Sequence, residues 1–263
     1  MLNAKRFLTG LIVAALALTG AATPERPQAK TRVYLLMGQS NMAGRGKVTA
    51  VYKSMQHPRV IMLNKNNQWT EAKHPVHFDK PDVAGVGPGL RFGMELAKAY
   101  PHDTIALVPC AVGGTSITKW EPGVYDKASK RHVYDDALAR IRTAMQKGTV
   151  HGVIWLQGEA DSGKDTAVNG YLSKLDGLIR NIRREVGNEQ LPWVAGELGR
   201  YRQRYLVFNK ELRKLPRKVA NTAVVTSTNL QHKGDTTHLD SPSADLYGKR
   251  FARQMIRLER KMK

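Results

Sequence analysis

The stretch VYLLMGQSNMAGRG, residues 33–46, joins a buried-strand pattern to an abrupt run of polar and small residues. The apolar run 33–37 is typical of a strand in a parallel sheet that is covered on both faces. The segment 38–44 follows at once and contains a serine, an asparagine and glycines. Ligands bind beyond the carboxyl ends of the strands in an open parallel sheet, so this junction is the first candidate site.

The same alternation of short apolar runs and longer amphipathic segments continues along the chain. The predicted strands are residues 33–37, 60–63, 104–109, 152–156, 193–197 and 223–226. The predicted helices are residues 90–100, 134–147, 167–186, 201–215 and 243–261. This pattern predicts an α/β fold, a single three-layer αβα domain with a central parallel sheet of five or six strands.

Two helices and one irregular stretch carry more detailed expectations. The residues expected to face the core on helices 134–147 and 243–261 are Ala137, Leu138, Ile141, Met145, Leu246, Phe251 and Met255. Ser241 or Ser243 is expected to cap the last helix. The stretch 65–89, rich in His, Pro and Asp, is expected to form a surface loop beside the site.

The N-terminal 22 residues have the layout of a secretory signal peptide. Lys5 and Arg6 give a positive start, residues 7–18 are apolar, and small residues follow at 20–22. A membrane anchor needs about 20 apolar residues, and this run is shorter. We therefore expect a secreted or periplasmic protein whose folded domain spans 23–263, with no transmembrane span in the mature protein.

The chain is strongly basic, with 42 Lys and Arg against 22 Asp and Glu and a formal net charge of +20. Such a charge attracts polyanions, so an acidic polysaccharide or an anionic envelope surface is an expected partner. Basic residues cluster at 200–204, at 213–218 and from 249 to the C-terminus, although a run of charge on a helix is usually a solvated face. Nucleic acid is not expected, since no nucleic-acid-binding motif accompanies the charge.

Cysteine, metal and cofactor chemistry are not indicated. Cys110 is the only cysteine, so no intramolecular disulfide can form, and it is expected to be a buried small hydrophobe. His74 and His77 lie near each other, but no H-E-x-x-H string or cysteine set completes a metal site. The sequence contains no phosphate-binding glycine fingerprint, so no cofactor is expected.

Polar segments that follow predicted strands offer the parts of an acyl-transfer site. A serine hydroxyl becomes a nucleophile when a histidine takes its proton, and a carboxylate orients that histidine. Ser40, His238 and Asp235 are the candidates. The three-residue spacing lets Asp235 reach Nδ1 of His238 while Nε2 faces the serine; Asp240 is the rival orienting carboxylate.

Oxyanion donors complete the predicted chemistry. The candidates are the Ser40 N–H, a backbone N–H of Gly113 or Gly114, and the side-chain amide of Gln157. Taken singly, a serine after a strand is often a helix cap and a glycine pair is often a turn. Their joint placement at one sheet edge favours catalysis.

Four segments, 33–46, 112–117, 155–161 and 235–238, resemble in order the motif blocks of the SGNH hydrolases. The similarity is to the branch that contains acetylxylan esterases and sialate O-acetylesterase-like proteins. It implies a carbohydrate O-acetylesterase with an acetyl-serine intermediate, acting on acetylated polysaccharide or acetylated sialic acid. Gln157 stands where the wider superfamily has asparagine, so its donor role follows from this branch. The G-x-S-x-G elbow of the α/β-hydrolases is absent around Ser40.

Residues beside these blocks are candidates for site support or substrate contact, namely Gln39, Asn41, Glu159 and Trp120. Trp120 is expected either to stack on a sugar ring or to pack. Glu159 and Asp161 are poorly placed to flank a glycosidic bond, being two residues apart on one loop, and are expected to hold the Gln157 loop. The alternatives are a non-catalytic carbohydrate- or envelope-binding protein, and a lipase or thioesterase of the same superfamily.

Overall fold

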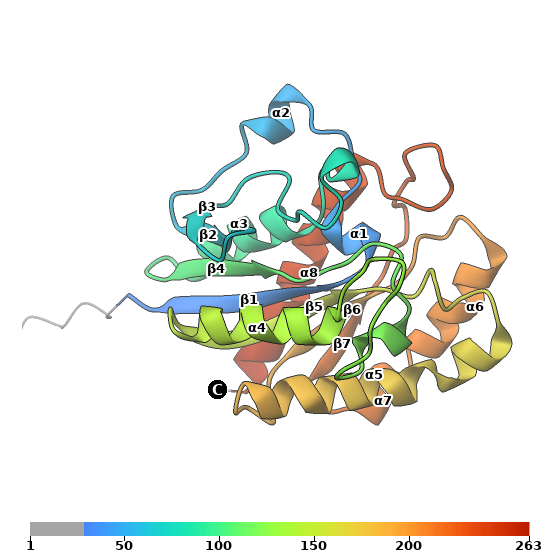
Figure 1. The fold of residues 1–263 in the computed structure, drawn as a ribbon. Coiled ribbons are helices and arrows are strands. Elements are labelled where there is room, and N and C mark those ends of the chain that lie inside the picture. Colours follow the sequence, from blue (N-terminus) through green and yellow to red (C-terminus); the bar gives the residue numbers. More distant parts are fainter. Residues whose placement is uncertain (1–28, 263) are drawn as a thin grey trace, which may run out of the picture.

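A computed structural model describes residues 29–262, and the predicted signal segment 1–22 lies outside this part. A seven-stranded sheet has the order β3-β2-β4-β1-β5-β6-β7 (Figure 1). Its strands are β1 Thr31–Gly38, β2 Val60–Leu63, β3 Trp69–Glu71, β4 Thr104–Pro109, β5 Thr149–Leu156, β6 Trp193–Gly196 and β7 Thr222–Val225. All pairings are parallel except β2 with β3. The α/β prediction is confirmed.

The expected strand count of five or six is one too low, because β3 was not predicted. This strand is three residues long and lies on the sheet edge, and two of its residues are exposed. So short a segment carries no hydrophobic alternation. It lies within the stretch 65–89, which is also less superficial than expected, because His74 and His77 are buried.

Helices cover both faces of the sheet. They are α1 Ser40–Ala43, α2 Ala50–Lys53, α3 Gly89–Ala99, α4 Val133–Met145, α5 Asp165–Glu185, α6 Gln203–Leu212, α7 Leu215–Lys218 and α8 Ser241–Lys261, with 3-10 turns η1 Pro81–Val83 and η2 Ile117–Trp120. On β1, Val33 and Leu35 pack into the core that includes α4 and α5, whereas Tyr34 and Leu36 pack into the core that includes α3 and α8. Figure 1 shows α3 and α4 on opposite sides of β1. Both faces of the central strand are therefore buried.

Some side-chain expectations are wrong. Met145 and Leu246 are each 39% exposed, whereas Phe251 and Met255 are buried as predicted. Leu246 points outward because Tyr247, the next residue, takes the buried position of that helical turn. The N-cap of α8 is Asp240, not a serine: its side chain accepts from the Ser243 N–H at 2.8 Å.

The strand order brings the motif segments together. β1 lies between β4 and β5, so the loops after these three strands meet at one edge of the sheet. Ser40 follows β1, Gly113 follows β4 and Gln157 follows β5. Neighbouring strands whose connections run in opposite directions leave a crevice there. Within residues 29–262, no helix is both long and apolar enough to cross a bilayer.

Candidate active site

Ser40, His238 and Asp235 form a continuous chain of hydrogen bonds. The His238 Nε2 atom lies 2.9 Å from Ser40 Oγ, and the Nδ1 atom lies 2.7 Å from Asp235 Oδ2. Ser40 opens α1 directly after the central strand, and His238 lies three residues before the start of α8. The structure therefore joins a hydroxyl and an imidazole that are 198 residues apart, in the arrangement expected from the sequence.

A tight turn positions the acid beside the base. Asp235 Oδ1 accepts the backbone N–H groups of Thr237 and His238 at 3.0 and 2.8 Å. Partial burial opposes ionisation of Asp235, but these hydrogen bonds and the His238 ring lower the pKa of its carboxyl to about 2. The carboxylate is thus held ionised against Nδ1. Asp240, the rival, caps α8 and makes no such contact with the imidazole.

Asn41 ties the nucleophile segment to the segment that carries the base. Its Nδ2 donates to the Thr237 carbonyl at 3.0 Å, and its Oδ1 accepts from the Leu239 N–H at 2.9 Å. These groups lie immediately before and after His238. Because Asn41 also follows Ser40 directly, one side chain links the placement of both reacting groups.

Of the three expected backbone oxyanion donors, two are free and one is engaged. Within residues 29–262, neither the Ser40 N–H nor the Gly114 N–H has an acceptor. Gly114 has φ +87° and open space where a Cβ would stand. The Gly113 N–H instead donates to Asp79 Oδ2 at 2.8 Å, which corrects its expected role. Ser40 and Gly114 are therefore the backbone donors available to a developing oxyanion.

A buried ion pair that the sequence reasoning missed supports the glycine loop, the turn that carries Gly113 and Gly114. Arg45 Nη2 lies 2.6 Å from Asp79 Oδ2, and the two side chains are 4% and 2% exposed. Burial opposes ionisation of Asp79, but the Arg45 guanidinium and the Gly113 N–H keep the pKa of that carboxyl below its ordinary value. A Cβ on Gly113 would lie 2.5 Å from Arg45 Nη2, so alanine there would require the ion pair or the loop to shift.

Gln157 does not face the catalytic serine, contrary to its predicted donor role. It is fully buried, and its Nε2 group contacts Gln39 Oε1, the Thr115 carbonyl and Asp161 Oδ2. An amide has two N–H groups, so these acceptors use both. Asp161 also accepts from the Ile117 N–H at 3.0 Å. Gln157 and Asp161 therefore hold the loops after β4 and β5 together.

Gln39 and Glu159 complete this support from either side. Gln39 Oε1 accepts from Gln157 Nε2 at 3.1 Å and approaches the Ala160 N–H at 3.4 Å. Glu159 Oε1 accepts from Asn41 Nδ2, whereas its buried Oε2 has no hydrogen-bond partner within residues 29–262. Burial raises the pKa of the Glu159 carboxyl above its ordinary value.

The Trp120 side chain is packed in the core, and its ring is not available to stack on a sugar. It is 1% exposed, its ring meets that of Trp155 edge to face at 5.1 Å between centroids, and its Nε1 donates to Thr115 Oγ1. The substrate-stacking alternative is therefore wrong in this structure. Cys110 is buried as expected, and burial raises the pKa of its thiol to about 11.

An open pocket of about 480 Å³ contains the catalytic groups. Ser40, His238, Gly114 and Glu159 line it, as do four cationic side chains: Arg45, which is paired with Asp79, and Lys80, Lys233 and Arg204, to which the sequence reasoning gave no role in the site. Lys80 precedes η1 and Arg204 lies on α6, so separate elements bring charge to one opening. Tyr205 also lines the pocket, and its buried hydroxyl has no partner within residues 29–262.

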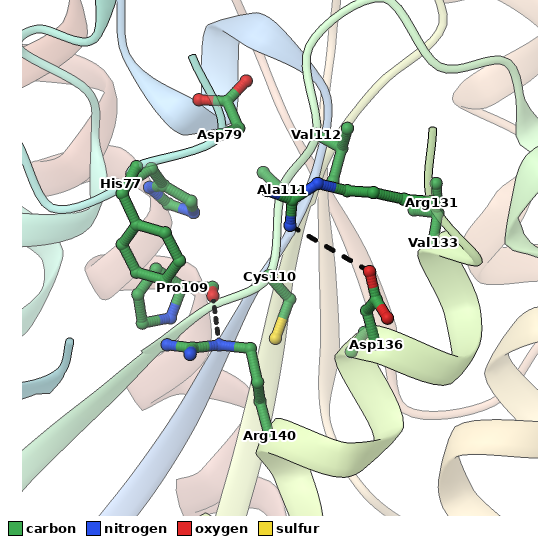
Figure 2. Close-up of a pocket in the computed structure, with 12 residues that line it drawn as sticks. His77, Asp79, Pro109, Cys110, Ala111, Val112, Arg131, Val133, Asp136 and Arg140 are labelled. Atoms are coloured by element: carbon green, nitrogen blue, oxygen red, sulfur yellow. Dashed lines mark hydrogen bonds and ion pairs between the residues drawn. The ribbon is translucent and has the colours of Figure 1, made fainter. Parts of the chain in front are cut away.

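A second cavity lies beside the segment that follows β4 (Figure 2). It holds about 30 Å³, is lined by His77, Asp79 and residues 110–112, and is closed on one side by Arg140. The Arg140 Nε donates to the Pro109 carbonyl at 2.9 Å. Such a space admits a water molecule or two but no sugar. Within the described part of the chain, no group of three or more His, Cys, Asp or Glu side chains is arranged to hold a metal ion.

Comparisons with known proteins identify the family. Residues 30–257 match the family model described as carbohydrate esterase, sialic acid-specific acetylesterase. The probable carbohydrate esterase At4g34215 of Arabidopsis thaliana is 29% identical over 252 residues, covering 84% of this chain and 91% of the relative. Its X-ray structure superposes with a TM-score of 0.77 at 27% identity, covering 87% of this chain and 98% of that one.

More distant structures share the fold. NanS has a TM-score of 0.68 at 18% identity, covering 89% of this chain and 99% of NanS. XAC1771, a carbohydrate acetylesterase from Xanthomonas citri, has a TM-score of 0.66 at 18% identity, covering 88% of this chain and 57% of that one. Together the findings define a carboxylic ester hydrolase with an SGNH-like fold. The chain belongs to the carbohydrate esterase family of sialic acid-specific acetylesterases, which confirms the resemblance seen in its motifs.

Proposed function

We propose that this carbohydrate acetylesterase removes O-acetyl groups from a sugar through an acetyl-serine intermediate on Ser40. The observation that carries the proposal is the hydrogen-bond chain from Ser40 Oγ through the His238 ring to Asp235. The pocket that contains this chain is open to solvent and large enough for a sugar.

Acylation begins when Ser40 Oγ attacks the acetyl carbonyl carbon as His238 Nε2 takes the hydroxyl proton. The carbonyl oxygen becomes an oxyanion, which the Ser40 and Gly114 N–H groups stabilise. Asp235 holds the imidazole in position and stabilises its charged form. The tetrahedral intermediate then expels the sugar oxygen, which receives the proton from His238, and acetyl-Ser40 remains.

Deacylation repeats these roles with water as the nucleophile. His238 Nε2 removes a proton from water as the oxygen attacks the acetyl carbonyl, and the same two N–H groups hold the second oxyanion. Collapse breaks the ester bond to Ser40, whose oxygen regains a proton from His238, and acetate leaves. Water, the sugar ester and these protein groups account for every atom and proton in the two steps.

The substrate is inferred from the charge at the pocket opening. The carboxylates of Glu159 and Asp235 also line the pocket, and Lys233 lies 3.9 Å from Asp235. Lys80 and Arg204 have no ion-pair partner within residues 29–262, which favours an acetylated sugar that also carries a carboxylate. Acetylated sialic acid and acetylated acidic polysaccharide both have this property. Comparing turnover of acetylated sialic acid with that of acetylated xylan, a largely neutral polymer, tests the choice; higher kcat/KM on xylan would contradict it.

Two other functions fit the site less well. A non-catalytic carbohydrate-binding role leaves the aligned Ser40, His238 and Asp235 without a purpose. A lipase or thioesterase needs an apolar groove for a long acyl chain, whereas Val83 is the only branched aliphatic residue lining this pocket. Activity that rises from acetate to octanoate esters would favour this second alternative.

An active-site-directed label tests the nucleophile. A small organophosphonate is expected to modify the purified protein once, on Ser40, as located by peptide mass spectrometry. Ser116→Ala provides a matched control, because Ser116 closely follows Gly113 and Gly114 and, within residues 29–262, its hydroxyl bonds only to Thr118 Oγ1. Modification at another residue, or loss of labelling in the control variant, would contradict the assignment.

We further propose that the protein acts outside the cytoplasm after removal of residues 1–22, which N-terminal sequencing of the exported protein would test.

A further inference from the structure

Three basic clusters mark the sequence, and the structure distinguishes them. In the first, Arg200 pairs with Glu197, Arg202 bonds to Thr236, and Arg204 lies at the pocket. In the second, Arg213 and Lys214 pair with carboxylates, whereas Arg217 and Lys218 lie on the short helix α7 without an ion-pair partner within residues 29–262. In the third, on α8, Arg250 donates to the Thr226 and Thr228 carbonyls, and the other cations form a longer exposed row.

The solvent face of α8 carries a straight row of cations, which we call the α8 basic stripe: Lys249, Arg253, Arg257 and Arg260. All four residues are exposed. Their spacings of four, four and three residues place them on one side of the helix, opposite the buried Tyr247, Phe251 and Met255. The stripe is about 16 Å long, from the rise of 1.5 Å per residue.

Carboxylates do not neutralise this stripe. Lys249 is 4.0 Å from Asp245, which is itself paired with Arg91 at 2.7 Å. Within residues 29–262, Arg253, Arg257 and Arg260 have no ion-pair partner at all. Glu259 is the only acidic residue between 246 and 262, and it points inward to bond with Tyr34 and Tyr100. The repulsion along the stripe is therefore relieved only by solvent ions or by an external anion.

The helix geometry favours a linear polymer over a membrane as that anion. A membrane-binding helix must insert its apolar face among the lipids, whereas the apolar face of α8 is already buried against α3 and the sheet. The stripe offers repeated charges along one line, and the apolar neighbours on that side of the helix are Leu246, which is 39% exposed, and Ile256, which is partly buried. A chain of regularly spaced carboxylates matches this arrangement.

We propose that the α8 basic stripe is a docking site for an acidic polysaccharide, separate from the catalytic pocket. Lys249 is eight residues into α8, about 12 Å along the axis from Ser241, and the stripe continues away from the catalytic edge. A polymer held there leaves the pocket open. The inference concerns a second surface and does not depend on which residue is the nucleophile.

The test measures binding of polygalacturonate, which carries carboxylates and no acetyl ester, to the full chain. The triple variant Arg253→Gln, Arg257→Gln and Arg260→Gln is compared with a charge-matched control, Lys174→Gln, Arg180→Gln and Arg184→Gln, whose sites are exposed on α5. Circular dichroism and hydrolysis of an aryl acetate verify that both variants are folded. Vesicles containing anionic phosphatidylglycerol provide the membrane arm.

Loss of three exposed ionic contacts is expected to weaken polygalacturonate binding about tenfold in the α8 variant, with little change in the α5 control. The wild-type affinity is also expected to fall as salt rises. Equal loss in both variants would show that net charge alone attracts the polymer and would overturn the proposal. Absence of binding by the wild type, or tighter binding to the vesicles than to polygalacturonate, would also overturn it. Aryl acetate hydrolysis reports on the proposed catalytic function independently.

Discussion

Asn41 holds the backbone on both sides of His238, through the Thr237 carbonyl and the Leu239 N–H. The base is carried on a turn whose residues Asp235 and Thr236 are exposed, and it needs a fixed partner. Asn41 is fixed by the turn that follows β1, next to the nucleophile. The distance between Ser40 and His238 is therefore set by one side chain in addition to the fold.

Asn41→Ala is expected to lower kcat about 100-fold with a smaller change in KM, because small misplacements of reacting groups are costly. Steady-state kinetics on an aryl acetate measures both. Asn181→Ala removes an exposed amide contact from α5 and is the control. A change confined to KM would contradict a role in positioning the base.

Asp235→Asn is expected to lower kcat by about 10⁴, as for loss of the acid in other catalytic triads. Because the pKa of Asp235 is about 2, the loss should be similar across the neutral range. Asp240→Asn retains a capping oxygen for α8 and is expected to retain turnover. The opposite ranking of the two variants would make Asp240 the orienting residue.

The same carboxylate affects stability at acid pH. Its folded pKa is lower than its ordinary value of 3.8, so ionised Asp235 stabilises the fold above that value. This contribution is lost as the pH falls toward 2. The difference in Tm between wild type and Asp235→Asn should therefore shrink on acidification; a constant difference would indicate that Asp235 does not hold a lowered pKa.

Gly113→Ala tests the buried pair beneath the glycine loop. The new Cβ would lie 2.5 Å from Arg45 Nη2 and 3.0 Å from Asp79 Oδ2, so the loop must shift. We expect a loss of about 2 kcal/mol in unfolding free energy, together with a lower kcat. At Gly170, in α5, an added Cβ meets nothing within 4 Å, and Gly170→Ala should stabilise by about 0.5–1 kcal/mol. Unchanged kcat in Gly113→Ala would show that the loop position is not critical.

Glu159→Gln probes a buried acid whose pKa is raised. Because the folded pKa lies above the unfolded one, ionisation costs stability, and the stability of the wild type falls as pH rises through the folded value. The glutamine can still accept from Asn41 and carries no charge. The Tm advantage of Glu159→Gln should therefore grow with pH. A pH-independent difference would contradict the raised pKa.

The sequence predicted what depends on local pattern. The apolar runs predicted six strands. Polar residues that follow these strands were expected at one edge of the sheet, and this placed Ser40 and His238 together. The edge strand β3 was missed because it has three residues, two of them exposed, and so short a segment shows no hydrophobic alternation. Leu246 was assigned to the wrong side of the helix because periodicity alone does not decide which of two adjacent apolar residues is buried. Tyr247, which has the larger side chain, takes the buried position.

Contacts between distant, irregular segments were beyond such reasoning. Arg45 and Asp79 are 34 residues apart, and Asp79 lies in a stretch with no regular structure, so their pairing had no sequence signal. Gln157 was assigned by resemblance, yet its amide is used by Gln39, Thr115 and Asp161. Trp120 looked equally suited to packing and stacking until its burial was known. Side-chain orientation, unlike strand placement, depends on the whole packed core.

The most direct measurement of the central claim is turnover of a small aryl acetate by purified Ser40→Ala beside the wild type. The account predicts that kcat falls by at least about 10³, because the substituted protein has no hydroxyl to form the acetyl intermediate. A rate within about twofold of the wild type would contradict it, since the hydrolysis would then proceed without the oxygen that faces His238.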